Sequence, residues 1–475
     1  MSQLKQEVLA EIERRKDKAA ALADEIWGYA ELGYEEHRTV AAQIAWMEAE
    51  GFRVIRDVAG IETAFIAEAG EGGPLIGILG EFDALANMSQ VAGSLSEVQP
   101  EAGEPGHGCG HHLLGSGAML AAAAVLAVLR RHGMKGQVRY YGCPAEEGGS
   151  GKVFMARAGA FDDLDVCFSW HANSLFSMHA SETLAIKTAE FHFHGRASHA
   201  AVSPHLGRSA LDAVELMNVG VNYMREHMLP EARVHYAMLD GGGRAANVVQ
   251  ARAVVGYTIR APLMSDAEEL YARICRIAEG AAMMSETRVE VKVSSGLSNV
   301  LTNSPLELAM YRNITDLIGP VSYSNEELSI ASRYQETFSA TDVLHTCRVF
   351  GKGEKVTSPL HQGIIPFDGT PTKVPVSTDA GDVSWIVPLA RCFGPCYAVG
   401  TPFHSWQMVA QGKLSYAHKG MFAAAKAIAA TALDAIDSPE LISAARAELD
   451  AKRNGKPWIC PLPPEMTHHM ARAEI

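Results

Sequence analysis

The stretch Leu75-Ile-Gly-Ile-Leu-Gly-Glu-Phe-Asp-Ala-Leu85 decides how the rest of the chain is interpreted. Its first six residues are apolar or glycine on both faces, as in a central strand of a parallel sheet. Acidic residues follow as soon as the apolar run ends. Because open α/β sheets bind their ligands outside the carboxyl ends of the strands, we expect a polar site at this edge.

Helices and strands are expected to alternate on both sides of this stretch. Apolar residues at helical spacing predict helices over 3–26 and 38–51. Beyond it, the pattern predicts helices over 113–132 and 150–158 and strands over 137–142 and 165–170. This rhythm is typical of a doubly wound α/β domain.

The rhythm changes near residue 183, where residues 185–194 begin to alternate at a period of about two. The order that follows is helix, strand, strand, helix, strand, which is typical of a ferredoxin-like α+β domain. We therefore expect a mixed-sheet catalytic domain formed by residues 1–183 and 299–475. An inserted lid or dimerisation domain is expected over 184–298.

Residues 320–376 show little pattern and are rich in Gly, Pro and Ser. Long loops are uncommon inside compact domains and are usually functional when they occur. The segment is therefore either a functional loop or a place where the pattern fails to reveal its elements.

Composition excludes some classes of partner. The chain has 475 residues, enough for two or more domains, and is 48% hydrophobic and 20% charged, as in soluble globular proteins. Its formal net charge of -14 argues against nucleic acid and against an anionic membrane surface as partners. A small anionic substrate remains compatible with a local cationic site.

Nothing in the sequence predicts export. The first residues lack a basic segment followed by an apolar core, so we expect no secretory signal. The longest apolar run, 118–129, is too short to span a bilayer. The 8 cysteines are dispersed without the spacing of a disulfide framework. Reduced thiols and a cytoplasmic location are the expectation.

Ligand-type side chains recur just after the strand-like runs. Gly106-His-Gly-Cys-Gly-His-His112 places one thiol and three imidazoles ahead of the helix expected over 113–132. In addition, Asp83, the pair Glu146 and Glu147, His171 and His404 follow four strand-like runs. Imidazole and thiolate bind borderline-soft divalent metals. A single histidine at a strand end is usually a packing residue, but ligand types at four strand ends favour a metal site.

The adjacent acids Glu146 and Glu147 are the most specific element of this set. Two carboxylates at the mouth of a buried strand repel each other unless a cation or a proton compensates them. A metal ion bound to one would leave the other free as a general base. An exposed loop is the alternative interpretation. His107 and His112 are left open as ligands or supporting residues.

The inserted domain carries weaker candidates. His199 could donate to a substrate oxyanion, or it could be an ordinary surface residue, and His205 lies close to it in sequence. Asn247 and Arg260 could hold a substrate carboxylate, for which the guanidinium fork is well suited. A solvated arginine at a strand end is the usual alternative. Asp379 could support the metal site or cap a helix.

Together these motifs resemble the M20 metallopeptidase and amidohydrolase family over essentially the whole chain. The resemblance rests on Glu-Phe-Asp83-Ala-Leu, Gly-Cys109-Gly-His111, Pro-Ala-Glu146-Glu147-Gly, Trp-His171 and Ser-His199-Ala-Ala-x-x-Pro-His205. It implies two divalent ions, zinc or manganese, in the large domain. It also implies a lid that dimerises, with a second copy or with a related subunit.

The resemblance also implies roles for individual residues. The implied metal ligands are Cys109, His111, Glu147, His171 and His404. Glu146 would be the general base and Asp83 would orient the metal site. His199 would reach the active site of the partner subunit, while Asn247 and Arg260, with His205 nearby, would contact the substrate.

The implied activity is hydrolysis of the amide bond of an N-acyl or N-aroyl amino acid, with p-aminobenzoyl-glutamate or a close analogue as the expected substrate. A dipeptidase or general aminoacylase of the same family is one alternative. A non-catalytic subunit that retains the metal site is another. His112 stands where many relatives carry an acid or amide, a departure expected to affect substrate choice rather than metal binding.

Overall fold

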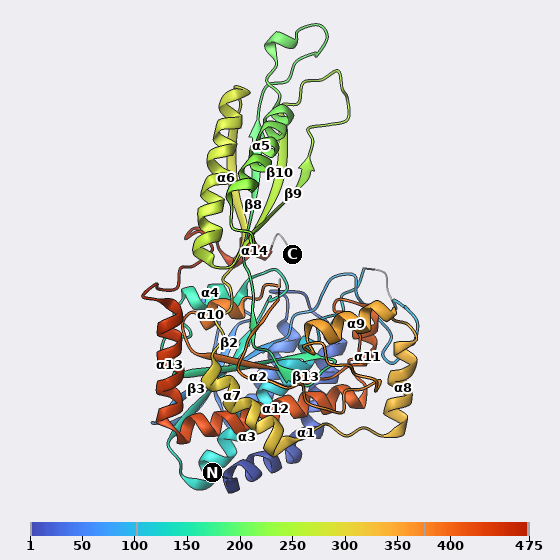
Figure 1. The fold of residues 1–475 in the computed structure, drawn as a ribbon, viewed down its shortest axis with the longest axis vertical. Coiled ribbons are helices and arrows are strands. Elements are labelled where there is room, and N and C mark those ends of the chain that lie inside the picture. Colours follow the sequence, from blue (N-terminus) through green and yellow to red (C-terminus); the bar gives the residue numbers. More distant parts are fainter. Residues whose placement is uncertain (1, 101–102, 375, 473–475) are drawn as a thin grey trace.

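The structure is a computed structural model that describes residues 2–100, 103–374 and 376–472. The chain forms a broad body and a narrower part that stands on it (Figure 1). The body is built on a seven-stranded sheet of order β1-β2-β4-β3-β5-β13-β6. Its strands are β1 (Arg53–Arg56), β2 (Phe65–Glu71), β3 (Leu75–Glu81), β4 (Gly136–Cys143), β5 (Val166–Asn173), β6 (Ser177–Met178) and β13 (Leu389–Pro395).

The four central strands β4, β3, β5 and β13 run parallel, while β1, β2 and β6 pair antiparallel with their neighbours. Every residue of β3 and β13 is buried, as expected for strands that are apolar on both faces. Their carboxyl ends lie at one edge, which places the segments that follow them side by side. The mixed α/β sheet expected from the sequence is confirmed.

Helices cover both faces of this sheet. Six helices form the main hydrophobic core with this sheet: α1 (Ser2–Tyr29), α2 (His37–Ala49), α3 (His111–His132), α7 (Ser304–Asn313), α12 (Ser415–Asp437) and α13 (Pro439–Arg453). A second core includes residues of α4 (Gly151–Arg157), α10 (Ala380–Ser384) and the C-terminal helix α14 (His468–Arg472). The burial of α3 on all sides explains its continuous run of Ala, Leu and Val.

Among the described helices, α3 is long and apolar enough to cross a membrane, but 94% of its most apolar window is buried inside the protein. Core helices of water-soluble proteins meet the same criterion, so this helix carries little weight as a membrane span. All eight cysteines are free. The cytoplasmic location stays a prediction.

The narrower part comprises residues 185–297, and we call it the lid. Its four-stranded antiparallel sheet has the order β11-β8-β10-β9. The strands are β8 (Ala185–His194), β9 (Arg233–Asp240), β10 (Arg252–Ala261) and β11 (Arg288–Leu297), and α5 (Ala210–Met224) and α6 (Met264–Met284) pack on them around a separate core. The ferredoxin-like order of elements is confirmed. Its two long connections, 195–209 and 241–251, extend from the end far from the body (Figure 1).

The segment 320–376 is not a single long loop, which corrects one of the two interpretations given above. It contains α8 (Asn325–Gln335) and α9 (Ala340–Val349). Both helices begin with a capping box, formed by Ser324 with Glu327 and by Ser339 with Asp342. Short elements complete the body, namely β7 (Ser181–Glu182), β12 (Thr372–Lys373) and α11 (Trp406–Gln411).

Candidate metal centre and substrate cavity

Five side chains that could bind a metal ion come from four segments and meet at the carboxyl edge of the sheet. Possible ligand atoms of Cys109, His111 and His171 all lie within 4.8 Å of one another, and so do those of Cys109, Glu147 and His404. Cys109 precedes α3, His111 begins it, Glu147 follows β4, His171 lies in β5 and His404 follows β13. Cys109 belongs to both groups, so the two possible sites have one residue in common.

The donor set fits bound cations. Cys109 Sγ lies 3.4 Å from His171 Nε2, and Glu147 Oε1 lies 3.3 Å from His404 Nε2. Two ligands of one tetrahedral zinc ion are separated by roughly 3–4 Å, given its bond lengths of about 2.0–2.3 Å. His111 Nε2 and Glu147 Oε1 are buried and make no hydrogen bond. Buried polar atoms nearly always have a partner, so these two atoms are suited to bind a cation.

The backbone is bent to bring these residues together. Gly110 has φ +79, and a Cβ at this position would lie 2.5 Å from the hydroxyl oxygen of Tyr397. Two residues with side chains also adopt positive φ here, Ala145 with φ 54 and His404 with φ 55. Such conformations are uncommon outside glycine and tend to occur at functional sites. Gly110 is therefore required by both its φ and its surroundings.

Hydrogen bonds fix the orientation of the histidine rings. Asp83 Oδ1 lies 2.9 Å from His111 Nδ1, and Asp83 Oδ2 accepts a hydrogen bond from the backbone N of Glu147 at 2.8 Å. His171 Nδ1 lies 2.9 Å from the carbonyl oxygen of Ala172. These contacts turn Nε2 of both rings toward the other possible ligands, where that of His171 lies 3.4 Å from Cys109 Sγ and that of His111 lies 3.5 Å from Glu81 Oε2, the usual arrangement behind metal-binding histidines. Asp83 therefore contacts both His111 and the loop that carries Glu147, and its role in orienting a metal site stays a prediction.

A buried ion cluster beneath the centre was not predicted from the sequence. The Nζ atom of the fully buried Lys152 lies 2.7 Å from Glu81 Oε1 and 2.6 Å from Asp379 Oδ1. Glu81 also joins His111 and Glu146 in a third group of possible ligands within 4.8 Å. Asp379 precedes α10 but forms no side-chain cap. The signal for Glu81 was its place two residues before Asp83, whereas Lys152 gives none.

Negative charge is in excess around this cluster. Burial raises the pKa of Glu146 well above its usual range, and Glu81, Asp379 and Glu147 raise it further. Burial likewise raises the pKa of the Cys109 thiol, with Glu147 adding to the effect. Several acids thus face one buried lysine, so bound cations would stabilise the ionised forms of this donor set.

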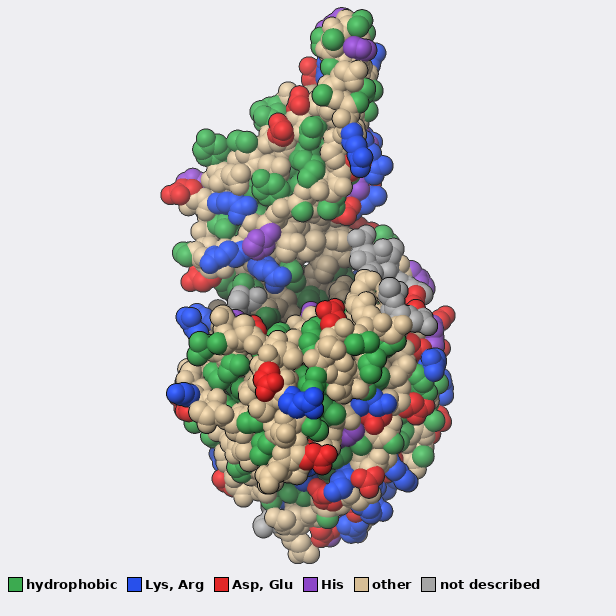
Figure 2. All heavy atoms as spheres, turned by 90° about the vertical axis from the view of Figure 1, so that its right-hand side faces the viewer, with side chains coloured by type: hydrophobic (Ala, Val, Ile, Leu, Met, Phe, Trp, Pro, Cys, Tyr) green, Lys and Arg blue, Asp and Glu red, His purple; other side chains and the backbone are tan. Residues whose placement is uncertain are grey.

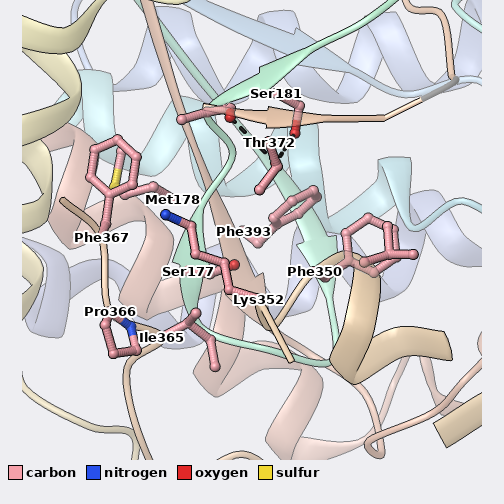
Figure 3. A pocket seen from close by; sticks show the side chains of 12 residues that line it. Ser177, Met178, Ser181, Phe350, Lys352, Ile365, Pro366, Phe367, Thr372 and Phe393 are labelled. Carbon is pink, nitrogen blue, oxygen red and sulfur yellow. Dashed lines mark hydrogen bonds between the residues drawn. The ribbon is translucent and has the colours of Figure 1, made fainter. Parts of the chain in front are cut away.

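A cavity of about 500 Å³ opens directly beside these residues. One wall is aromatic: the ring centroids of Phe350 and Phe393 are 5.3 Å apart, those of Phe350 and Phe403 are 5.7 Å apart, and His179 stacks on Phe393 at 3.9 Å. A much narrower pocket shares Phe350 and Phe393 with this cavity (Figure 3). Seen from the side, the surface is hollowed between the lid and the body (Figure 2).

The candidate residues that the sequence suggests in the lid lie in two different places. His199, His205 and Asn247 are exposed on the connections at its far end, where the backbone N of Ala200 donates to the carbonyl oxygen of Asn247 at 2.9 Å. None of these three lines the cavity of the same chain. Arg260, in contrast, is half-buried at the base of the lid and donates to Ser377 Oγ at 3.0 Å. Ser377 is part of the cavity wall.

His107 and His112 face away from the centre. His107 Nε2 lies 3.1 Å from the carbonyl oxygen of Ile26, and His112 Nε2 lies 3.0 Å from that of Gly412. Burial lowers the pKa of His107 to about 4, so its ring is neutral at neutral pH. Both rings join the glycine-rich loop to the surrounding helices rather than to the group of ligands.

Comparison with known proteins places the chain among hydrolases. The sequence model of Peptidase family M20/M25/M40 matches residues 78–474. A p-aminobenzoyl-glutamate hydrolase subunit of Escherichia coli is 44% identical over 466 residues, covering 96% of this chain and 97% of its own. The Xaa-Arg dipeptidase of Mus musculus is 28% identical, covering 94% and 93%.

Solved structures share the same architecture. A dinuclear metal binding peptidase of the M20 family from Bacillus subtilis superposes with a TM-score of 0.58 at 18% sequence identity. The match covers 90% of this chain and 99% of that one. At this identity the match supports the fold, including both the sheet of the body and the lid.

Proposed function

We propose that this chain, which belongs to peptidase family M20/M25/M40, is a metal-dependent amidohydrolase of N-acyl or N-aroyl amino acids. The proposed substrate is p-aminobenzoyl-glutamate or a close analogue. The observation that carries the proposal is the convergence of Cys109, His111, Glu147, His171 and His404 beside a cavity with an aromatic wall. The extended similarity to a p-aminobenzoyl-glutamate hydrolase subunit supports the choice of substrate.

Two divalent ions would be held by these five residues. The thiol and imidazoles suit zinc, and the carboxylate suits manganese as well. Such ions supply Lewis acidity toward the amide carbonyl and lower the pKa of bound water. Asp83 fixes the positions of His111 and of the Glu147 backbone, so the proposed ligands would need little rearrangement to bind a metal ion.

Glu146 would act as the general base and acid. One of its oxygens lies within 4.8 Å of ligand atoms of Glu81 and His111, and its side chain lines the cavity. Its carboxylate would take a proton from the attacking water and deliver it to the nitrogen of the leaving amine. The neighbouring Glu147 would be a metal ligand, so the two adjacent acids would divide the roles of base and ligand between them.

We also propose that the chain assembles through the lid. Tyr223 and Val219 on α5 are 77% and 53% exposed, and β9, an edge strand, exposes Tyr236, Met238 and Leu239. Exposed apolar side chains beside an unpaired strand edge are typical of a protein interface. The partner would be a second copy or a related chain, because the Escherichia coli relative is itself named as a subunit. Through this interface His199 would reach the cavity of the partner.

The test uses the purified chain alone, loaded with zinc or manganese. Release of amine is measured with p-aminobenzoyl-glutamate, N-acetyl amino acids and dipeptides, each with and without a chelator. We expect hydrolysis of p-aminobenzoyl-glutamate that the chelator abolishes. Preference for dipeptides would favour the dipeptidase alternative, and metal binding without any turnover would indicate a non-catalytic subunit.

A further inference from the structure

Arg391 is a buried cation in the wall of the cavity. It lies in the middle of β13, where it pairs with Ser169 of β5, and two residues later Phe393 pairs with His171. Side chains alternate along a strand, so Arg391 lies on the same face of the sheet as Phe393 and His171. Only 5% of Arg391 is exposed, and the residue lines the cavity.

The guanidinium of Arg391 makes no hydrogen bond or ion pair with the described residues, although the charges of Glu81, Glu307 and Glu146 act on it from a distance. Its Nη2 is buried without a hydrogen bond, and no carboxylate of the described chain forms an ion pair with it. Lys152 offers the contrast, because two carboxylates lie within 2.7 Å of its equally buried ammonium. An unpaired buried charge is costly, so proteins rarely keep one without a ligand or counter-ion.

A second unpartnered group lies beside it. His179 Nδ1 is buried and makes no hydrogen bond, while the backbone N of His179 donates to the carbonyl oxygen of Arg391 at 2.9 Å. The imidazole stacks on Phe393 and lines the same cavity. The cavity therefore combines an aromatic wall with one unpaired cation and one unpaired imidazole nitrogen. This combination matches a ligand that joins an aromatic ring to an anionic group.

We propose that Arg391 binds the side-chain carboxylate of the substrate and thereby makes the enzyme selective for acidic amino acids. This inference rests on the proposed amidohydrolase function. A guanidinium presents two parallel N–H donors that match a carboxylate, and the interaction is strengthened by burial. The α-carboxylate would remain with Arg260 at the base of the lid. A buried cation also disfavours the basic side chain of an Xaa-Arg dipeptide.

The test compares two substrates that differ only in this charge, p-aminobenzoyl-glutamate and p-aminobenzoyl-glutamine. For Arg391→Gln we expect kcat/KM on the glutamate substrate to fall at least about tenfold, the effect of losing a hydrogen bond to a charged group. On the glutamine substrate kcat/KM should change little. Arg391→Lys should keep part of the preference, because it retains the charge but not the fork.

Lys352→Gln provides the matched control. Lys352 lines the narrow pocket and not the large cavity, and its ammonium lies 5.0 Å from the ring centroid of Phe367 (Figure 3). Removing this cation should leave both substrates unaffected. Thermal unfolding of every variant establishes that the fold is intact. Binding without turnover is measured on chelator-treated protein, where glutarate should raise the Tm of the wild type but not that of Arg391→Gln.

The outcomes separate this inference from the function on which it rests. If the wild-type chain cleaves none of the p-aminobenzoyl substrates, the proposed function fails. If it cleaves both but Arg391→Gln loses the same factor on each, Arg391 serves only as a counter-charge to the buried acids Glu81, Glu146 and Glu307. A wild-type enzyme without preference for glutamate over glutamine would also overturn the role assigned to Arg391.

Discussion

Asp83 holds His111 in place: its Oδ1 lies 2.9 Å from the imidazole Nδ1, and both side chains are buried. The second carboxylate oxygen accepts a hydrogen bond from the backbone N of Glu147. One carboxylate therefore connects the first residue of α3 to the loop that follows β4. Two of the proposed ligands keep their relative position through this single side chain.

Replacing Asp83 with Asn should weaken metal binding while preserving the fold. Loss of such a supporting carboxylate typically lowers metal affinity by about 10–100-fold, because the ring orientation and the basicity of the ligand both change. Competition with a chromogenic chelator measures the affinity. Asp163→Asn is the control, since Asp163 is 57% exposed in an ion pair with Arg139. An unchanged affinity in Asp83→Asn would contradict this role.

The two adjacent acids should respond differently to the same substitution. Glu146→Gln should retain the metal and lose turnover by a factor of about 10²–10⁴, the usual contribution of a general acid–base residue. Glu147→Gln should instead lose metal, because it removes a ligand atom. Elemental analysis and single-turnover kinetics on both variants distinguish the roles. Wild-type turnover in Glu146→Gln would refute its function as base.

Much of this site could be predicted because its residues follow apolar strands. Glu147, His171 and His404 stand at or after the ends of β4, β5 and β13, and parallel strands end at one edge of the sheet, whereas Cys109 and His111 stand at the start of α3. The order of helices and strands in the lid could also be predicted, because alternation of apolar residues at a period of two is distinct from helical spacing. Local patterns were sufficient where each element buries one continuous face.

The rest of the site depends on contacts between distant segments. Lys152 reaches Asp379 across 227 positions of sequence, a pairing that no local pattern reveals. Helices α8 and α9 are short and polar, so their apolar spacing was too weak to identify them, although their capping boxes were readable. Arg391 did leave a signal, as a single cation inside an otherwise apolar buried strand.

Replacing Lys152 with Met should destabilise the protein strongly. The substitution leaves the buried carboxylates of Glu81 and Asp379 without their shared cation, and breaking a buried ion pair typically costs about 3–5 kcal/mol. Urea unfolding of chelator-treated protein measures the loss without a contribution from bound metal. Adding Asp379→Asn to this variant should recover part of the stability. No recovery in the double variant would show that charge is not the cause.

Acid sensitivity should depend in part on His361. Its Nδ1 accepts a hydrogen bond from the backbone N of Phe176, and burial lowers its pKa from 6.5 to about 4. Between these values the unfolded chain binds more protons, so this residue's contribution is complete above pH 6.5 and is lost as the pH falls toward 4. The shift in the pKa of His361 corresponds to a change on the order of 3 kcal/mol in the free energy of unfolding between the two ends of this range.

We therefore expect His361→Gln to lose less stability than the wild type as the pH is lowered from neutrality toward the folded-state pKa of His361. The free energy of unfolding in urea, measured at intervals across this range, checks the prediction. Other buried histidines contribute equally to both proteins, so only the difference between them is informative. The exposed His37 provides the control, and His37→Gln should follow the wild-type profile. Parallel profiles for His361→Gln and the wild type would contradict the assignment.

His199 should act on the cavity of a partner rather than on its own. In the structure it is exposed at the far end of the lid and does not line the cavity of its own chain. We expect His199→Ala and Glu146→Gln each to be nearly inactive alone. Mixed dimers of the two variants would contain one site with both residues intact, so random exchange should restore roughly a quarter of wild-type activity.

This complementation is measured after exchange of chains between dimers, with the dimer fraction followed by sedimentation velocity. Tyr223→Asp provides the matching control, because a charge on the exposed face of α5 should prevent association and abolish the recovery. A monomeric chain with full activity would exclude a role for His199 between protomers. If the chain associates only when a related protein is added, the same mixing experiment with that protein decides whether His199 acts between unlike chains.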